Sequence, residues 1–148
     1  MILLDTNVLS ELRKASGGRI DPNVLAWAER EDAENFWLSA VTVQEIEFGI
    51  LAAERRDSDK AVAFRTWLEG EVLTGFRSRI LPYDVAVAQV CAALHLPQTR
   101  PQRDAMIAAT ALVHHLTVAT RNVRDFAGTG VRLIDPWAYR VGTGSGPP

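Results

Sequence analysis

Short apolar runs alternate along this chain with longer segments whose apolar residues recur at helical spacing. The short runs predict buried strands at residues 2–4, 36–39, 79–81, 117–120 and 131–134. The longer segments predict helices at residues 7–13, 22–31, 42–54, 59–73, 84–95 and 101–115. Strands that are separated by helices usually pair in parallel. The pattern therefore predicts an α/β sandwich with a mainly parallel central sheet of about five strands.

The end of the chain differs in composition from the rest. Residues 141–148 are rich in glycine and proline, which predicts a flexible tail. Residues 1–140 are expected to form a single domain, because 148 residues is the usual size of one domain. A hydrophobic content of 47% can supply the core of that domain, so disorder is not expected.

The overall charge gives no support for nucleic-acid binding, because the formal net charge is −2. Any contact with nucleic acid would need a local basic patch. The same basic residues fit equally well as a solvated surface. The candidate patches are Arg13 with Lys14, Arg100 with Arg103, and Arg121 with Arg124.

The single cysteine, Cys91, cannot form an intrachain disulfide, which fits a reducing compartment. It shares an apolar helical pattern with Val87 and Leu94, so we expect a buried structural thiol. No stretch approaches the roughly 20 apolar residues of a membrane span. The N-terminus lacks the basic region of a signal peptide. The expected location is the cytoplasm, without a membrane partner.

Acidic residues stand where predicted strands end and where a predicted helix begins. Asp5 follows the first strand, Asp125 follows the fourth, and Asp104 begins the apolar face of the last helix. Ligands bind at the carboxyl ends of parallel strands. Carboxylate oxygens without a cluster of cysteine or histidine suit a hard cation. Each of these acids also has a plainer interpretation as a helix or turn cap.

The other titratable residues are less informative. Glu45 and Glu47 each share a helix face with apolar residues, so periodicity does not choose between them. Asp84 is interpreted as a helix cap and Asp135 as a surface loop residue. Adjacent histidines on a regular helix cannot both face one metal. The histidines interpreted as charges near helix C-termini are His95, His114 and His115.

Four segments occur in an order that resembles a known family. They are ILLDTNV at residues 2–8, LSAVTVQE at 38–45, DAMIAATA at 104–111 and VATRNVRDF at 118–126. Together they resemble the PIN-domain ribonucleases, specifically the VapC and FitB type of toxin in bacterial toxin–antitoxin pairs. The tripeptide at 135–137 is similar to the closing Asn-Pro-Trp of that family, with Asp in place of Asn. The resemblance spans about residues 1–140.

The resemblance implies a three-layer PIN-domain-like sandwich and a site for Mg²⁺ or Mn²⁺. The resemblance assigns Glu45, and not Glu47, to the acidic site. Arg103 departs from the family, whose members often have a small or apolar residue at this place. The implied catalytic residues are the metal-binding acids Asp5, Glu45, Asp104 and Asp125, with polar helpers at Asn7, Thr120 and Asn122.

A mechanism follows from that set of residues. Neighbouring carboxylates raise each other's pKa, and a divalent metal removes this repulsion. The metal also lowers the pKa of a bound water, which makes hydroxide available to attack a phosphodiester. Asp5 and Asp104 would be direct ligands, while Glu45 and Asp125 would bind the metal or orient its water. The expected function is a metal-dependent endoribonuclease that is the toxin of a type II toxin–antitoxin pair.

The resemblance also implies partners. Arg121 and Arg124 are candidates for contacts to the RNA backbone. A homodimer and a small cognate antitoxin are expected, with an amphipathic antitoxin segment laid in an apolar groove. The groove residues fit equally well as ordinary core. They are Val24, Trp27, Ile46, Ile50, Phe64 and Trp67.

Other functions stay open alongside the ribonuclease. A structure-specific DNA nuclease would use the same carboxylates, and the balanced charge does not separate RNA from DNA. A catalytically silent binding module is disfavoured because all four acids are present. A phosphoacceptor signalling domain needs an earlier acidic pair and a strand-end lysine near the C-terminus, and the sequence has neither.

Overall fold

The central sheet has five strands in the order β3-β2-β1-β4-β5, and every neighbouring pair is parallel. The computed structural model describes residues 1–142, so residues 143–148 of the predicted tail lie outside the described part. The predicted α/β fold with a parallel five-stranded sheet is confirmed. The strands are β1 (Ile2–Leu4), β2 (Phe36–Ser39), β3 (Ile80–Leu81), β4 (Thr117–Ala119) and β5 (Leu133–Ile134).

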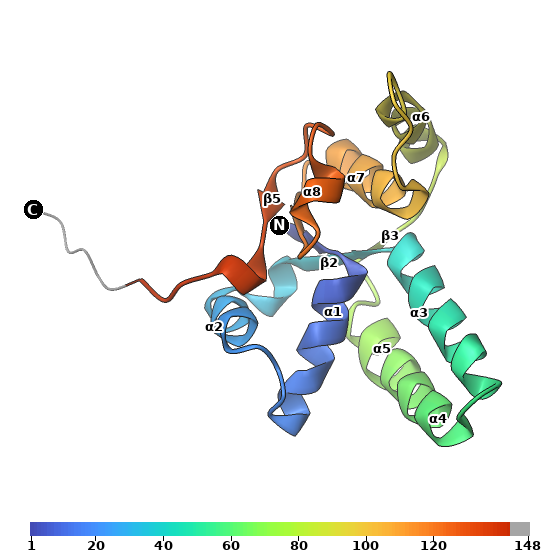
Figure 1. Ribbon diagram of the computed structural model, residues 1–148, viewed down its shortest axis with the longest axis vertical. Helices are drawn as coiled ribbons and strands as arrows, with labels where there is room; N and C mark the ends of the chain where they lie inside the picture. The colour runs from blue at the N-terminus through green and yellow to red at the C-terminus, as the bar shows by residue number, and fades with distance from the viewer. Residues whose placement is uncertain (143–148) are drawn as a thin grey trace, which may run out of the picture.

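Helices cover both faces of the sheet, which gives three layers (Figure 1). One face carries α1 (Thr6–Leu12), α2 (Pro22–Arg30), α3 (Ala40–Glu54), α4 (Ser58–Trp67) and α5 (Leu73–Gly75). The opposite face carries α6 (Val85–Leu94), α7 (Gln102–His114) and α8 (Val123–Phe126). Short 3₁₀-helices add Arg13–Gly17, Ala33–Asn35 and Pro136–Ala138.

Most predicted element ends shift by no more than two residues, and two helical segments differ further. The helix predicted at 59–73 is three consecutive pieces, because α4 passes through a π-helical turn, Leu68–Val72, before α5. Such a turn continues the helix without a break in the chain direction, and a pattern of apolar residues does not distinguish it from α-helix. The four-residue helix α8 was not expected, since it is too short to show a period.

Side-chain caps explain where several helices begin. The carboxylate of Asp21 accepts hydrogen bonds from the first turn of α2, and Pro22 occupies its first position. Asp84 caps α6 by accepting from the backbone N–H of Val87, as predicted. Asp135 was expected to be a surface loop residue. It is half-buried and caps the turn Pro136–Ala138 by accepting from Trp137 N at 3.0 Å.

The core is built on both faces of β1. Leu3 packs with Ile107 of α7 on one face, and Leu4 packs with the α1–α4 layer on the other. Small residues line the buried side of α7, which lets this helix approach the sheet closely. At Ala108, which has no exposed surface, overpacking by a larger side chain would cost about 1–3 kcal/mol. This close approach carries the first turn of α7 to the carboxyl edge of the sheet.

The remaining core lies between α6 and α7. Cys91 is buried there with Val87, Ala105 and Ala109, so the predicted structural thiol is a core residue. Across residues 1–142, no helix is both long enough and apolar enough to span a bilayer.

Candidate active site

Four acidic side chains gather at the carboxyl edge of the sheet. Asp5 directly follows β1, and Glu45 stands on α3, which follows β2. Asp104 lies in the first turn of α7, and Asp125 lies in α8, just beyond β4. The four carboxylates are close enough to repel one another. The charges of neighbouring acids help to raise the pKa values of Asp5, Glu45 and Asp104. Four distant segments of the chain therefore contribute to one acidic site.

Asp5 is the most enclosed of the four, with 4% of its surface exposed. Its carboxylate accepts hydrogen bonds from Thr120 Oγ1 at 2.7 Å, Thr6 N at 2.8 Å and Asn7 Nδ2 at 3.3 Å. Burial raises the pKa of Asp5, the hydrogen bonds oppose that shift, and the charge of Asp125 adds to it. The bond to Thr6 also makes Asp5 the cap of α1, so the plainer interpretation of this residue holds as well.

Glu45 faces the site while its neighbour Glu47 faces another helix. The carboxylate of Glu45 accepts from Thr6 Oγ1 at 3.1 Å and pairs with Arg103 Nη1 at 3.6 Å. Burial raises the pKa of Glu45, and the charge of Asp5 adds to that effect. Glu47 instead pairs with Arg65 Nη1 of α4 at 2.7 Å. The structure thus separates two glutamates that periodicity leaves equivalent.

Asp104 shows the largest electrostatic effect. Burial raises its pKa to about 6, with further increases from the charges of Asp5, Asp125 and Glu45. Arg103 opposes these increases. Pro101 occupies the N-cap of α7, which has no side-chain cap hydrogen bond, so Asp104 does not cap this helix, although its place in the first turn suits the helix dipole. A half-buried carboxylate with no cap to form, set beside three acids, is typical of a functional site.

Asp125 is exposed, and polar residues beside it connect the strand ends. Thr120 Oγ1 donates to Asp5 and accepts from the backbone N–H of Asn122 at 3.0 Å. Asn7 Oδ1 accepts from the backbone N–H of Arg121 at 3.3 Å. These bonds fix the loop after β4 against the loop after β1. Asn122 takes part in them through its backbone.

Comparison with known proteins identifies the family. The chain matches the PIN domain over residues 2–130. This chain belongs to the PIN-domain family. It is 40% identical over 143 residues to the VapC ribonuclease Y4jK of Sinorhizobium fredii, with 93% of this chain and 98% of that protein covered. It is 39% identical over 143 residues to the toxin FitB of Neisseria gonorrhoeae, covering 93% and 99%. The crystal structure of FitAcB from Neisseria gonorrhoeae superposes with a TM-score of 0.82 at 36% identity, covering 93% and 99%.

The resemblance to VapC- and FitB-type PIN domains is therefore confirmed. The identity extends over nearly the whole of each relative, so it is not confined to one motif. The match covers all four segments on which the resemblance was based.

The four acids of this PIN domain have the oxygen atoms that a hard divalent cation prefers, but their side chains are not yet arranged to bind one. All four are oxygen donors, and the raised pKa values of Asp5, Glu45 and Asp104 reflect burial together with negative charge that is not fully compensated. Within residues 1–142, however, no three acidic, histidine or cysteine side chains stand ready to hold a metal ion. Asp5 is held by its three hydrogen bonds, and Glu45 is held by Thr6 and Arg103. Binding a metal would require some of these side chains to turn toward it.

The three histidines lie at helix ends, as expected. His95 follows α6, and its Nδ1 accepts from Arg100 N at 3.1 Å. His114 is in the last turn of α7, and His115 ends that helix with a φ of +57°.

Sequence reasoning missed Thr6 as a site residue. Its hydroxyl lies between Glu45 at 3.1 Å and the hydroxyl of Thr42 at 3.2 Å, so it links α1 to α3. Its position directly after Asp5 is the only hint that the sequence carries. Arg103 was noted as a departure from the family, but its contact with Glu45 depends on the docking of α7 beside α3.

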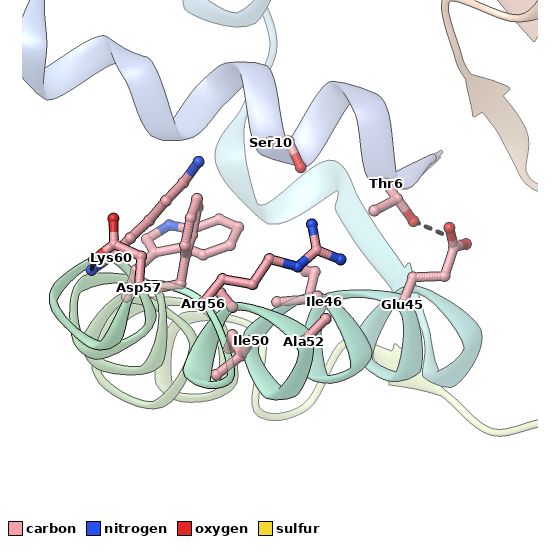
Figure 2. A pocket seen from close by; sticks show the side chains of 13 residues that line it. Thr6, Ser10, Glu45, Ile46, Ile50, Ala52, Arg56, Asp57 and Lys60 are labelled. Atoms are coloured by element: carbon pink, nitrogen blue, oxygen red, sulfur yellow. Dashed lines mark hydrogen bonds between the residues drawn. The ribbon is translucent and has the colours of Figure 1, made fainter.

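A groove extends from the acidic site along the helical layer of the PIN domain. This cavity of about 490 Å³ lies between α1, α3 and α4 (Figure 2). Figure 2 shows Thr6 and Glu45 at one end and Asp57 and Lys60 at the other. Its apolar lining includes four of the six residues expected there, Ile46, Ile50, Phe64 and Trp67.

The other two expected groove residues do not line the groove, whereas Ile46 and Ile50 are buried but border it. Val24 and Trp27 are buried, and Trp27 stacks against Phe36 of β2 with 5.3 Å between ring centroids. For these two residues the alternative interpretation as ordinary core is the correct one, because the apolar face of α2 packs on the sheet.

Proposed function

We propose that this PIN domain is a metal-dependent endoribonuclease that acts as the toxin of a toxin–antitoxin pair. The observation that carries the proposal is the meeting of four carboxylates at one sheet edge, with the pKa of Asp104 raised to about 6. The names of the relatives, a VapC ribonuclease and the FitB toxin, give the reaction class and the biological role.

Asp5 and Asp104 would hold Mg²⁺ or Mn²⁺, with Glu45 and Asp125 as further oxygen ligands or as partners of its water. Such an ion, when bound, compensates the clustered negative charge and lowers the pKa of water. The residues around the acids fix them in place. Thr120 holds Asp5 at 2.7 Å, and Thr6 holds Glu45 at 3.1 Å.

Arginines beside the acids supply the charge that an RNA backbone needs. Arg121 and Arg124 are both exposed, and Arg121 lies over the ring of Trp137 at 5.1 Å. Arg103 pairs loosely with Glu45 and is 60% exposed, so it is free to turn toward a phosphate. Contacts of this kind position a strand without selecting its sequence. They compensate locally for a net charge of −2.

The groove between α1, α3 and α4 is the proposed docking site of a cognate antitoxin. An amphipathic antitoxin segment would cover the half-buried rings of Phe64 and Trp67, which line the groove. Because Glu45 lines the same groove, a basic antitoxin side chain at that end would reach the acidic site. The proposed homodimer has candidate contacts in three apolar side chains that are at least 49% exposed, Phe48, Leu51 and Val62.

The test is cleavage of single-stranded RNA, structured RNA and DNA by the purified chain, with Mg²⁺, with Mn²⁺ and with EDTA. Two variants on the same helix form a matched comparison. The Glu45→Gln variant should lose most of its activity, while the Glu47→Gln variant should retain it. RNA cleavage that persists in EDTA would contradict the mechanism. Cleavage of DNA in preference to RNA would favour the DNA-nuclease alternative. Co-purification with a small upstream-encoded protein, and loss of activity in that complex, would test the toxin role.

A further inference from the structure

We propose that a polar cavity between the α6–α7 loop and α8 binds the nucleoside adjacent to the scissile phosphate of an RNA strand. The inference rests on the proposed ribonuclease function and specifies how the substrate is held. The cavity has a volume of about 320 Å³. That is close to the lower limit of about 300 Å³ for small-molecule pockets, which suits a single nucleoside better than a larger ligand. Its walls come from residues 96–101 and from Arg124, Asp125 and Ala127.

The cavity is fixed in shape by Arg100. The guanidinium donates from Nε to Leu94 O at 2.8 Å and from Nη1 to Ala127 O at 2.6 Å. The backbone N–H of Arg100 donates to His95 Nδ1 at 3.1 Å. These three bonds fasten the loop to the end of α6 on one side and to the segment after α8 on the other.

Gly128 leaves space for the guanidinium of Arg100. Its φ of +78° suits glycine, and a Cβ there would lie 2.9 Å from Arg100 Nη2. The guanidinium therefore packs directly against the backbone that follows α8. Because Arg100 is used in this way, it is a structural wall of the cavity rather than a free cation.

The chemistry of the walls selects a nucleoside. Gln98 and Thr99 are exposed and carry both donors and acceptors, which matches the mixed edges of a base. Pro97 and Pro101 give apolar surface for the face of a base. Asp125 can accept a hydrogen bond from a ribose hydroxyl, while Arg100 and Arg124 on the same walls supply positive charge for a phosphate at the edge of the cavity.

The position of the cavity places the phosphate outside it, toward the acids. Asp125 lines the cavity and also acts on the pKa values of Asp5 and Asp104, so the cavity and the acidic site meet at this residue. Arg124 is exposed beside it and supplies a cation for the adjoining backbone. A strand that places one nucleoside between Gln98 and Asp125 would therefore present its next phosphate to the acidic site.

Two measurements on the full chain test the inference. The first is an NMR titration with the four 5′-ribonucleotides and their 2′-deoxy forms, which needs no cleavage. We expect shifts confined to residues 96–101 and 124–127, and larger shifts for ribonucleotides than for the deoxy forms. The second is the cleavage pattern on an RNA pool of randomised sequence, compared between the parent and the double variant Gln98→Ala/Thr99→Val.

The double variant should raise KM about tenfold, the change expected for loss of one or two hydrogen bonds. It should also change the base preferred beside the cut, while kcat falls much less. Gln89→Ala is the matched control, because Gln89 is exposed on α6 and does not line the cavity. Circular dichroism would check that each variant folds.

The outcomes separate this inference from the proposed function. RNA cleavage with the same base preference in parent and double variant would overturn the cavity assignment and leave the nuclease standing. Nucleotide shifts elsewhere, or none, would also overturn it. Shifts in the cavity in a chain that cleaves no RNA would support the subsite and contradict the ribonuclease proposal.

Discussion

Two acidic clusters in this PIN domain have similar compositions and opposite electrostatics. Around Arg65, Glu47 pairs at 2.7 Å, Glu54 at 3.7 Å and Glu69 at 3.8 Å. The carboxylate of Glu47 has a lowered pKa, because Arg65 donates to it. At the sheet edge, by contrast, burial and neighbouring acids raise the pKa of Asp104 to about 6.

The difference lies in how each cluster is compensated. The Arg65 cluster joins α3 to α4 at the surface, and its cation belongs to the fold. The sheet-edge acids are half-buried or buried except for Asp125, and the cation nearest to them, Arg103, pairs with Glu45 at only 3.6 Å. Carboxylates that lie close together without a compensating positive charge repel one another and destabilise the folded protein. A bound cation removes that repulsion. From that contrast we interpret the Arg65 cluster as structural and propose the sheet-edge acids as functional.

The largest expected effect is on catalysis. Asp5→Asn and Asp104→Asn should each lower the rate of RNA cleavage by more than about 100-fold, the upper end of effects from residues that only orient a ligand. A neutral amide cannot replace the charge of a carboxylate ligand. Asparagine is also a good helix cap, so Asp5→Asn should leave α1 intact. Glu54→Gln, in the Arg65 cluster, serves as the control; equal losses in both clusters would erase the distinction between them.

A second effect is stabilisation by metal. Mg²⁺ or Mn²⁺ at about 100 times its Kd should raise the free energy of unfolding by about 2.7 kcal/mol, because it binds only the folded state. Thermal unfolding with and without metal measures this gain. The gain should vanish in Asp104→Asn and persist in Arg65→Met. A metal-dependent Tm shift in the Asp104 variant would place the ion elsewhere.

A third effect is the pH dependence of stability without metal. The folded-state pKa of Asp104 is raised from 3.8 to about 6, so the folded protein binds more protons than the unfolded chain between these values. Stability therefore falls as pH rises through this window, and the loss is complete above pH 6. Asp104→Asn should then stabilise the metal-free protein at pH 7 by about 1 kcal/mol, once solvent screening of a half-buried group is allowed for.

Denaturant unfolding at pH 4 and pH 7 would measure that gain, which should be lost at the lower pH. Glu47→Gln should behave in the opposite way. Its lowered pKa contributes stability that is present above the usual value of 4.5 and disappears as pH falls through the folded pKa. Parallel pH profiles for the two variants would contradict the assignment of opposite electrostatics.

The sequence predicted the fold well because the information is local. Short apolar runs such as 36–39 and 117–120 lie between helices, and this alternation is typical of a parallel sheet. Asp5 and Asp125 could be placed at one edge for the same reason, since both follow strands of that sheet. The periodicity of α7 likewise placed Asp104 at its start, facing the sheet.

What the sequence left open depends on contacts between distant segments. Glu45 and Glu47 differ because Arg65 of α4 pairs with one and Thr6 of α1 donates to the other. No periodicity within α3 contains that information. The same limit explains Trp27, whose apolar helix face fits a groove or a core equally well until the sheet is in place. The roles of the acids as metal ligands stay predictions that the experiments above address.

The smallest expected effect concerns the compensated cluster itself. Arg65→Met removes the cation that Glu47, Glu54 and Glu69 share, yet all four side chains are at least 28% exposed. Exposed pairs contribute little, and salt screens them, so Tm should fall only slightly in dilute buffer. In about 1 M NaCl, where the Debye length shrinks to about 3 Å, the difference from the parent should disappear. RNA cleavage and the metal-dependent Tm shift should be unchanged, because the sheet-edge acids do not contact Arg65. A large loss of stability that persists in high salt would mean that Arg65 supports α4 through packing of its aliphatic stem. Charge compensation would then not be what distinguishes the Arg65 cluster from the sheet-edge acids.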